Sequence, residues 1–420
     1  MTAPGSAGGP PADPSRAVEA VWRLEAGRII AGLVRLTGDV GLAEELAQDA
    51  LLAALERWPR DGVPANPGGW LALTARNRAL DLLRRRRVHE RKVAELGRDL
   101  SDAPGPDLDA ALDDPVGDDL LRLIFIACHP VLRPEGRAAL TLRLLGGLTT
   151  EEVARAFLIS EAAASQRIVR AKRTLAERGV PYELPTAADL PERLTSVLGV
   201  VYLIFNEGYS ATAGTDWTRP SLCEEAMRLA RLLAGLLPDE PETHGLQALT
   251  ELHGSRLPAR AAPDGSPVLL PDQDRRRWDR LLIRRGMAAL ERAAASGPPG
   301  RYTLQAAIAA CHATSPSFPE TDWPRITALY AQLSARWPSP VVTLNHAMAV
   351  SMSEGPEQAL AMLAPLTTTL PDSPHLSAAR ADLLARLGRT SEARTAYLQA
   401  ARKTQNPQEK SLYLQKSRSP

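Results

Sequence analysis

Residues 149 to 176, TTEEVARAFLISEAAASQRIVRAKRTLA, restrict the possible folds of this chain more than any other segment. They read as two short helices joined by a tight turn. Thr149 and Glu152 have the three-residue spacing of a capping box, which fixes the start of the first helix. Ser160 follows the turn as an N-cap, with Glu161 at the positive end of the second helix dipole. The segment therefore predicts a helix-turn-helix, a motif that places its second helix in the major groove of DNA.

The second helix of this segment has an apolar face and a basic face. The inward stripe, at steps of four, three and four, consists of Ala164, Ile168, Ala171 and Leu175. The residues facing away are Ala162, Gln166, Val169, Arg170 and Arg173, with Ser165, Arg167 and Lys172 on the flanks. Glutamine and arginine read base edges, and lysine and arginine also bind phosphate. A surface hairpin of any α-helical protein has similar apolar spacing, so the motif alone leaves both interpretations open.

Helical periodicity extends over nearly the whole chain of 420 residues. Alanine and leucine dominate, β-branched runs are scarce, and 44% of the residues are hydrophobic, so we predict a globular all-α fold. The longest apolar run, residues 197–205, is far shorter than the ~20 residues of a membrane span. The cysteines, Cys128, Cys223 and Cys311, are too far apart for zinc or disulfide motifs. We expect a soluble cytoplasmic protein with no metal, no cofactor and no membrane contact.

The formal net charge of +1 hides two oppositely charged blocks. Nine arginines or lysines lie between Arg76 and Arg98, against three acidic residues. Eight aspartates and no basic residue follow between Asp99 and Asp119. The acidic block is too polar to fold and reads as a linker. The first 15 residues lack an apolar core and a basic start, so they read as a disordered tail rather than a signal peptide.

Three helices are expected before the acidic block. Residues 16–36 and 39–58 are amphipathic, and the second helix is opened by Asp39 and closed before Pro59. Asn66 and Pro67 form an N-cap and first-turn pair, which starts a third helix that continues into the arginine run. Leucines and alanines on more than one side of this third helix imply that it packs on two sides.

The remaining stripe of the third helix combines an aromatic ring, an amide and charged groups. Its candidate site residues are Trp70, Asn77, Asp81, Arg84 and the neighbouring Arg85. A ring and an amide beside arginines suit unstacked bases and their phosphates. A solvated basic helix end, with Asp81 paired to Arg84 or Arg85, is the plainer interpretation of the same residues.

A repeat of 34 residues is present near the C-terminal end. Ala359 and Ala393 are separated by the tetratricopeptide period. The same offset relates two further pairs of small and large positions, Ala347 with Ala381 and Leu363 with Tyr397. Because several positions agree at one period, we predict an array of helical hairpins.

These features predict two small helical domains joined by an acidic linker and followed by a large helical extension. The parts are a tail at 1–15, a helical domain at 16–98, the linker at 99–118, a helix-turn-helix domain at 119–178, a connector at 179–191, a helical extension at 192–338 and tetratricopeptide-like repeats at 339–416.

The order of these parts resembles the bacterial extracytoplasmic-function sigma factors of the sigma-70 class. The resemblance rests on PGGWLALTARNRALDLLRRRR, the acidic linker and LTTEEVARAFLISEAAASQRIVRAKRTL, and it covers roughly residues 16–178. The remainder, including LTSVLGVVYLIFNEGYSAT at 194–212, resembles the subgroup with a long tetratricopeptide-like C-terminal extension.

The resemblance implies binding to core RNA polymerase, at the β′ clamp helices and the β flap region, and to duplex and melted promoter DNA. The implied contacts to the clamp helices are Glu45, Gln48 and Asp49. The Arg60 to Gly68 loop and the helix with Trp70, Asn77, Asp81 and Arg84 would hold the melted minus-10 element. The implied readers of the minus-35 element are Ser165, Gln166, Arg167, Arg170 and Arg173. Ala162 and Ala163 are small where polar reading side chains often lie, which shifts base reading toward those residues.

Two other functions stay open at this point. An ordinary helix-turn-helix regulator, whose repeats bind a ligand or peptide, needs no polymerase contact. An enzyme has little support, because HExxH, GxSxG and phosphate-loop motifs are missing and the seven histidines are scattered, so we expect no catalytic residue. The polar cluster from Phe205 to Tyr209 is interpreted as a helix end. We expect the extension to regulate the DNA-binding domains through an intramolecular or protein contact.

Overall fold

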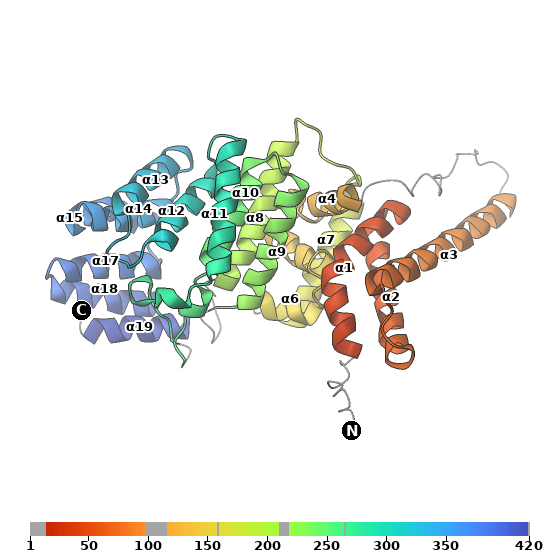
Figure 1. Cartoon of the computed structure of the whole chain (residues 1–420), viewed down its shortest axis with the longest axis horizontal. Helices are drawn as coiled ribbons and strands as arrows, with labels where there is room; N and C mark the ends of the chain where they lie inside the picture. Colours follow the sequence, from red (N-terminus) through yellow and green to blue (C-terminus); the bar gives the residue numbers. More distant parts are fainter. Residues whose placement is uncertain (1–13, 97–115, 158, 210–217, 264–265, 419–420) are drawn as a thin grey trace, which may run out of the picture. The chain divides into compact units, whose positions relative to one another are not determined.

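The computed structural model describes residues 14–96, 116–157, 159–209, 218–263 and 266–418. These residues form α-helices, a few short 3-10 turns and one isolated bridge between Ala261 and Pro267, which confirms the all-α prediction (Figure 1). Most of the predicted tail and nearly all of the predicted acidic linker lie outside the described residues, and α1 already begins at Pro14, inside the predicted tail. The chain divides into two compact units, residues 1–155 with 159–200, and residues 156–158 with 201–420. None of the described helices is long and apolar enough to cross a lipid bilayer.

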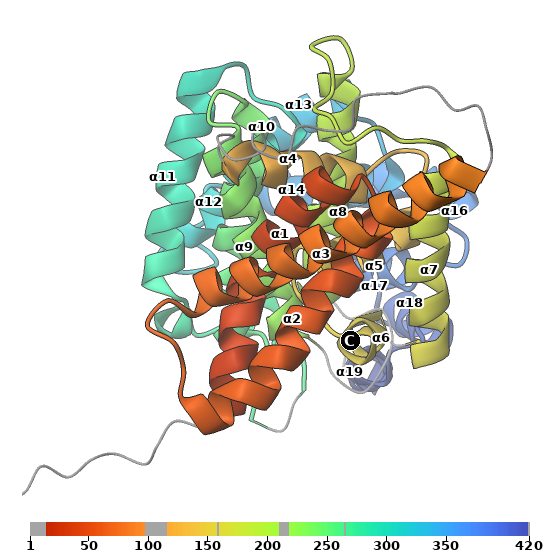
Figure 2. The ribbon, with the colours of Figure 1, turned by 90° about the vertical axis from the view of Figure 1, so that its right-hand side faces the viewer.

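Seven helices and the first half of an eighth supply the first unit. They are α1 (Pro14–Thr37), α2 (Val40–Asp61), α3 (Pro67–Leu96), α4 (Val116–Ala127), α5 (Pro134–Leu144), α6 (Thr150–Phe157, its last two residues excepted), α7 (Glu161–Glu177) and α8 (Leu190–Tyr209). Helix α1 packs against α2, α3 and α4, and α5 packs against α7. Figure 2 shows α3 crossing the pair formed by α1 and α2. Trp22, Ile30, Trp58 and Leu71 are buried between these helices.

Local capping signals place the starts of α2 and α3 as expected. The Asp39 side chain accepts from the Leu42 amide at 3.0 Å, and the Asn66 side chain accepts from the Gly69 amide at 3.0 Å. The predicted end of α2 is wrong, because the helix continues through Pro59 to Asp61. Pro59 removes one backbone hydrogen bond and crowds the preceding turn, and the buried ring of Trp58 holds the last turn in place.

Helix α3 buries one side only, which corrects the expectation of packing on two sides. Its buried residues Leu71, Ala75 and Ala79 are four apart and form a single stripe. Leu73, by contrast, is 58% exposed. The small side chains on the buried stripe allow α3 to approach α1 and α2 closely, while the opposite face stays open to solvent.

The helix-turn-helix has the predicted local structure. The Thr149 amide donates to the Glu152 carboxylate at 2.9 Å, and the Glu152 amide donates to the Thr149 hydroxyl at 3.1 Å, which completes the capping box. The Ser160 hydroxyl accepts from the Ala163 amide at 3.2 Å at the start of α7. All four residues of the predicted inward stripe of α7 are buried.

The second unit contains the rest of α8, eleven further α-helices and three short 3-10 turns among its described residues. The helices are α9 (Pro220–Leu236), α10 (Pro241–Gly254), α11 (Arg280–Ser296), α12 (Arg301–Thr314), α13 (Trp323–Arg336), α14 (Pro340–Ser353), α15 (Pro356–Leu363), α16 (Leu366–Thr369), α17 (Pro374–Arg386), α18 (Thr390–Lys403) and α19 (Pro407–Arg418). The turns are η2 (Leu257–Ala259), η3 (Leu270–Asp272) and η4 (Arg275–Arg277). The cluster from Phe205 to Tyr209 is the end of α8, as interpreted from the sequence.

The 34-residue repeat corresponds to two helical hairpins, α14 with α15 and α17 with α18. All six repeat positions are buried, and they fall into one cluster with Ala347, Ala359 and Leu363 and a second with Ala381, Ala393 and Tyr397. Ser339 and Ser373, also 34 apart, cap the first helix of each hairpin through their hydroxyls. The predicted hairpin array is therefore confirmed, and α19 packs on α18 as its last described helix (Figure 1).

Candidate nucleic-acid interface

Helix α7 presents the predicted reading face to solvent. Ser165, Gln166, Arg170 and Arg173 are exposed, and Arg167 is half-buried. The Arg173 guanidinium donates to Glu177 one turn later at 2.6 Å, which raises the pKa of Arg173 above its ordinary value. The face therefore offers amide, hydroxyl and guanidinium donors, the groups that bind base edges and phosphates.

One flank of α7 is engaged with α2 instead of solvent. The ammonium group of Lys172 pairs with the carboxylate of Glu44, and the Arg143 guanidinium on α5 donates to the same carboxylate at 2.6 Å. The Glu44 side chain is only 6% exposed. A single buried carboxylate on α2 thus connects α5 and α7.

Sequence reasoning missed Glu44, although the sequence carries a signal for it. Glu44 lies among the inward positions Ala43, Leu46 and Ala47 of α2, where a charge needs a buried partner. Its two partners lie 99 and 128 positions away in the sequence (143 − 44 and 172 − 44). The pattern therefore shows that a partner is required but does not identify it.

The candidate residues on α3 lie along its open face. Asn77, Asp81, Arg84 and Arg85 are exposed, whereas Trp70 is half-buried. The Trp70 ring meets the ring of Trp58 edge to face, with centroids 5.7 Å apart, so its orientation is fixed by the core.

An ion pair on α3 matches the plainer interpretation of this helix. The Arg84 guanidinium lies 3.7 Å from the Asp81 carboxylate, and both side chains are largely exposed. Such exposed pairs contribute little to stability and are easily exchanged for another partner. The pair therefore does not prevent either side chain from binding DNA.

The candidate polymerase contacts lie on the outer face of α2. Glu45 and Asp49 are exposed and Gln48 is half-buried. The Asp49 carboxylate lies 3.6 Å from the Arg78 guanidinium of α3, a neighbour that sequence reasoning did not identify. The structure thus places these residues and the α3 residues on adjoining helices, while the α7 residues form a separate surface.

The connector after α7 is attached to the first unit. The Tyr182 hydroxyl lies 2.9 Å from the carbonyl oxygen of Ala31 and 2.8 Å from that of Asp119, and it donates to one of them. Burial raises the pKa of Tyr182 well above its ordinary value. At the start of α8, Arg193 donates to the Phe125 carbonyl at 2.8 Å. The beginning of α8 therefore belongs structurally with the helices before it.

The side chains at these surfaces can form hydrogen bonds and ion pairs with a bound partner. Within them, no three His, Cys, Asp or Glu side chains lie close enough together to hold a metal ion. The candidate side chains on α3 and α7 are hydrogen-bond donors, cations, the Asp81 carboxylate and the half-buried ring of Trp70. These are the side chains of nucleic-acid contacts.

The sequence matches three protein families. Residues 22–88 match Sigma-70 region 2, residues 122–175 match Sigma-70, region 4, and residues 193–294 match a family of unknown function, DUF6596. The first match corresponds to most of α1, α2 and α3, and the second to most of α4 through α7.

Two individual proteins are also similar to this chain. The uncharacterized protein R00370 of Rhizobium meliloti (strain 1021) is 46% identical over 366 residues, which cover 87% of this chain and 86% of the relative. The crystal structure of yeast Tom70 aligns with 96% of this chain and 84% of its own, at 12% identity and a TM-score of 0.31. A likeness that weak carries no argument, so the hairpin assignment rests on the buried repeat positions.

Proposed function

Since this chain belongs to the sigma-70 class of sigma factors, in an extracytoplasmic-function-like form with a C-terminal extension, we propose that it binds core RNA polymerase and directs it to specific promoters. The observation that carries the proposal is the pairing of regions 2 and 4 in one chain with an open polar face on each. An ordinary helix-turn-helix regulator has no use for the α2 and α3 surfaces.

We propose that the exposed face of α7 reads the minus-35 element. Gln166 and Arg170 are exposed one turn apart on this face, and Arg170 has no ion pair among the described residues, so both are available to base edges. Ser165, Arg167 and Arg173 would add phosphate or base contacts. Arg170→Gln should weaken binding to minus-35 DNA at least tenfold, the scale of one good base contact. Arg178→Gln, just beyond α7, is the matched control.

For the minus-10 element, we propose that α3 holds a melted strand. Trp70, oriented by Trp58, would stack on or beside an extruded base, and Asn77, Asp81, Arg84 and Arg85 would contact the base and its phosphates. Asn77→Ala should slow the formation of open complexes, measured by permanganate reactivity of promoter thymines, and leave duplex minus-35 binding unchanged. Equal effects on both steps would contradict this assignment.

Polymerase binding is proposed for the outer face of α2, through Glu45, Gln48 and Asp49, on the β′ clamp helices. Asp49→Asn should lower affinity for core polymerase, measured by fluorescence anisotropy. Glu56→Gln is a control on the same helix, because Glu56 is also exposed. If Asp49→Asn binds core polymerase as tightly as Glu56→Gln does, the assignment of Asp49 as a polymerase contact is wrong.

The decisive experiment is reconstitution of transcription. The purified chain is mixed with core polymerase and genomic fragments, including the promoter of its own operon, and the transcripts are sequenced. Specific initiation supports the proposal. If no promoter is used and core polymerase does not bind the chain in a pull-down, the alternative of an ordinary helix-turn-helix regulator replaces it.

We further propose that the C-terminal extension regulates the DNA-binding regions. The extension is covalently attached and larger than the part that it would control. A stop after Val200 tests the idea, because it preserves the hydrogen bonds that the first turns of α8 make within the first unit. The truncated and full chains should differ in transcription or in polymerase binding. Identical behaviour in both assays would refute regulation by the extension.

A further inference from the structure

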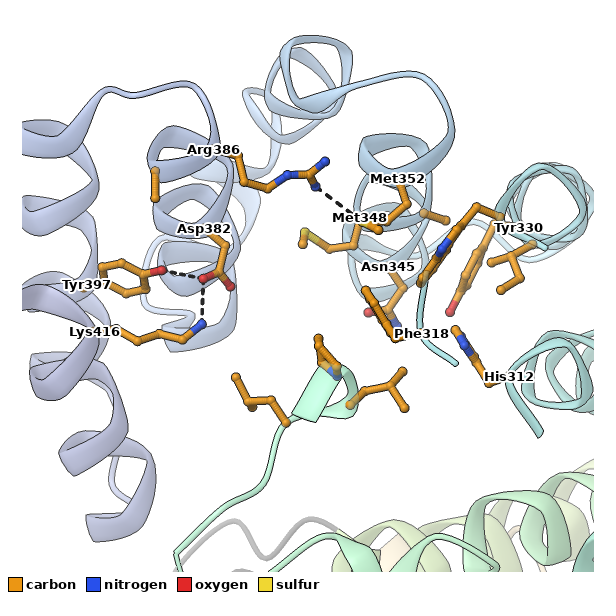
Figure 3. Close-up of a pocket in the computed structure, with 17 residues that line it drawn as sticks. His312, Phe318, Tyr330, Asn345, Met348, Met352, Asp382, Arg386, Tyr397 and Lys416 are labelled. Carbon is orange, nitrogen blue, oxygen red and sulfur yellow. Dashed lines mark hydrogen bonds and ion pairs between the residues drawn. The ribbon is translucent and has the colours of Figure 1, made fainter. Parts of the chain in front are cut away.

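The second unit has a partly open cavity of about 750 Å³ beside its repeats (Figure 3). The turn η3 and helices α12, α13, α14, α17, α18 and α19 all contribute to its lining. This volume lies in the range of sites for small organic molecules, which are typically about 300–1,000 Å³. The cavity therefore has the size of a ligand site rather than of a packing defect.

One side of the cavity is apolar and aromatic. Phe318, Trp323 and Tyr330 line it, together with the methionines Met348 and Met352 of α14. The Phe318 and Trp323 rings meet edge to face, with centroids 5.0 Å apart, which fixes their orientation. Methionine side chains adapt their shape to a neighbour. This side can therefore accept a flat apolar body.

The other side carries charged groups that hydrogen bonds hold in place. The Asp382 carboxylate accepts from the Lys416 ammonium at 2.8 Å and from the Tyr397 hydroxyl, as Figure 3 shows. The positive charge of Lys416 thereby balances the negative charge of Asp382. The lining near α18 and α19 is polar and close to neutral.

Arg386 leaves this side with one excess positive charge. Its guanidinium donates to the Ser351 hydroxyl at 2.9 Å and to the Ser351 carbonyl at 2.8 Å, and both acceptors are neutral. No acidic side chain among the described residues pairs with it. His312 adds no charge at neutral pH, since burial, followed by the nearby arginines, lowers its pKa to about 3. The cavity is thus suited to an anion.

The two chemically different sides come from equivalent repeat positions. Met348 and Met352 on α14 are each 34 residues before Asp382 and Arg386 on α17. The same inward-facing positions are thus apolar in one repeat and charged in the next. Equivalent positions of the two repeats thus carry different side chains, which gives the cavity one apolar side and one charged side.

We propose that this cavity binds a small amphipathic organic anion. Its aromatic body lies against Phe318, Trp323 and Tyr330, and its acidic group pairs with Arg386. The site is separate from the DNA-binding and polymerase-binding surfaces proposed above. Ligand binding is measured without DNA or polymerase, so its outcome is independent of the proposed function.

Two matched dyes test the inference on the full chain. Anilinonaphthalene sulfonate is an aromatic anion, and phenylnaphthylamine has the same body without the sulfonate. We expect the anionic dye to bind with one-to-one stoichiometry and about tenfold tighter than the neutral dye, as one charge-assisted contact provides. Equal affinities for the two dyes would overturn the proposal whatever any variant does.

Three variants locate the site. Arg386→Gln should remove most of the difference between the dyes and change the affinity of the neutral dye less than twofold. Arg389→Gln is the control, because Arg389 is exposed and paired with Glu392 away from the cavity. Phe318→Ala, in the loop before α13, should weaken both dyes by a similar factor. If Arg386→Gln lowers the affinity of the anionic dye no more than Arg389→Gln does, the assignment is wrong.

Discussion

Replacing Glu44 by glutamine should loosen the contact between α2 and the helix-turn-helix. The change keeps the shape of the side chain but removes the charge shared by Arg143 and Lys172. Arg143 is 16% exposed and Lys172 is 23% exposed, so two partly buried cations would be left facing each other. The Lys172 side chain is long enough to turn toward water, whereas Arg143 is also held by the Leu148 carbonyl at 2.8 Å.

The expected loss is about 3 kcal/mol. Removing one partner of a buried ion pair typically costs about 3–5 kcal/mol. We take the lower end, because glutamine still accepts one hydrogen bond and Lys172 can reach solvent. This loss corresponds to roughly a hundredfold change in a local opening equilibrium.

Hydrogen exchange measured by mass spectrometry on the full chain resolves the effect by segment. In Glu44→Gln, protected amides of α5 and α7 should exchange up to roughly a hundredfold faster, while those of α17 stay unchanged. The neighbouring variant Glu45→Gln is the control, since Glu45 is exposed and should shift exchange less than twofold. Protection in α5 and α7 within threefold of the original chain would refute the reasoning.

Three further predictions concern strain, pH and thiols. Gly38→Ala should cost about 1 kcal/mol of unfolding free energy from its positive φ of 69° alone, and Gly147→Ala about 2 kcal/mol, because its new Cβ would also lie 3.2 Å from the Trp22 ring. Equal losses of unfolding free energy in the two variants, measured by urea unfolding, would contradict this difference. Burial, and to a lesser extent nearby arginines, lowers the pKa of His253 and His312 to about 3. Their contribution to the free energy of unfolding is therefore complete above the unfolded pKa of about 6.5 and is lost as pH falls toward 3. Each histidine should lower the free energy of unfolding by about 2 kcal/mol at pH 5 relative to its value above pH 6.5. If the pH dependence of urea unfolding is the same in His253→Gln as in the original chain, this prediction is wrong. Burial raises the pKa of all three cysteine thiols, so each should react with Ellman's reagent at pH 8 only on unfolding, and one fast thiol in the folded chain would disprove this.

Sequence reasoning succeeded where the interacting residues are close in the chain. The capping box of Thr149 and Glu152 needs groups only three residues apart, so their identities suffice to predict it. The prediction from the 34-residue repeat was correct for a related reason, because each buried position occurs in both hairpins.

The incorrect predictions depend on contacts that are distant in sequence. Pro59 stays helical because the buried Trp58 holds that turn, and Leu73 is exposed because α1 and α2 cover only one side of α3. The partners of Glu44 lie on other helices, so no local pattern identifies them. The DNA and polymerase contacts stay predictions, since exposure shows that these side chains are accessible but not what they bind.

The carboxylate of Asp382 has a consequence for how the end of the repeat array unfolds. In a linear array each hairpin is stabilised by its neighbours alone, so terminal helices tend to fray first. Asp382 on α17 accepts hydrogen bonds from Tyr397 on α18 and Lys416 on α19, so detachment of α19 breaks the Lys416 contact and opens that side of the cavity. A bound ligand would then oppose the detachment of α19, and slower hydrogen exchange of the α19 amides would report how fully the cavity is occupied.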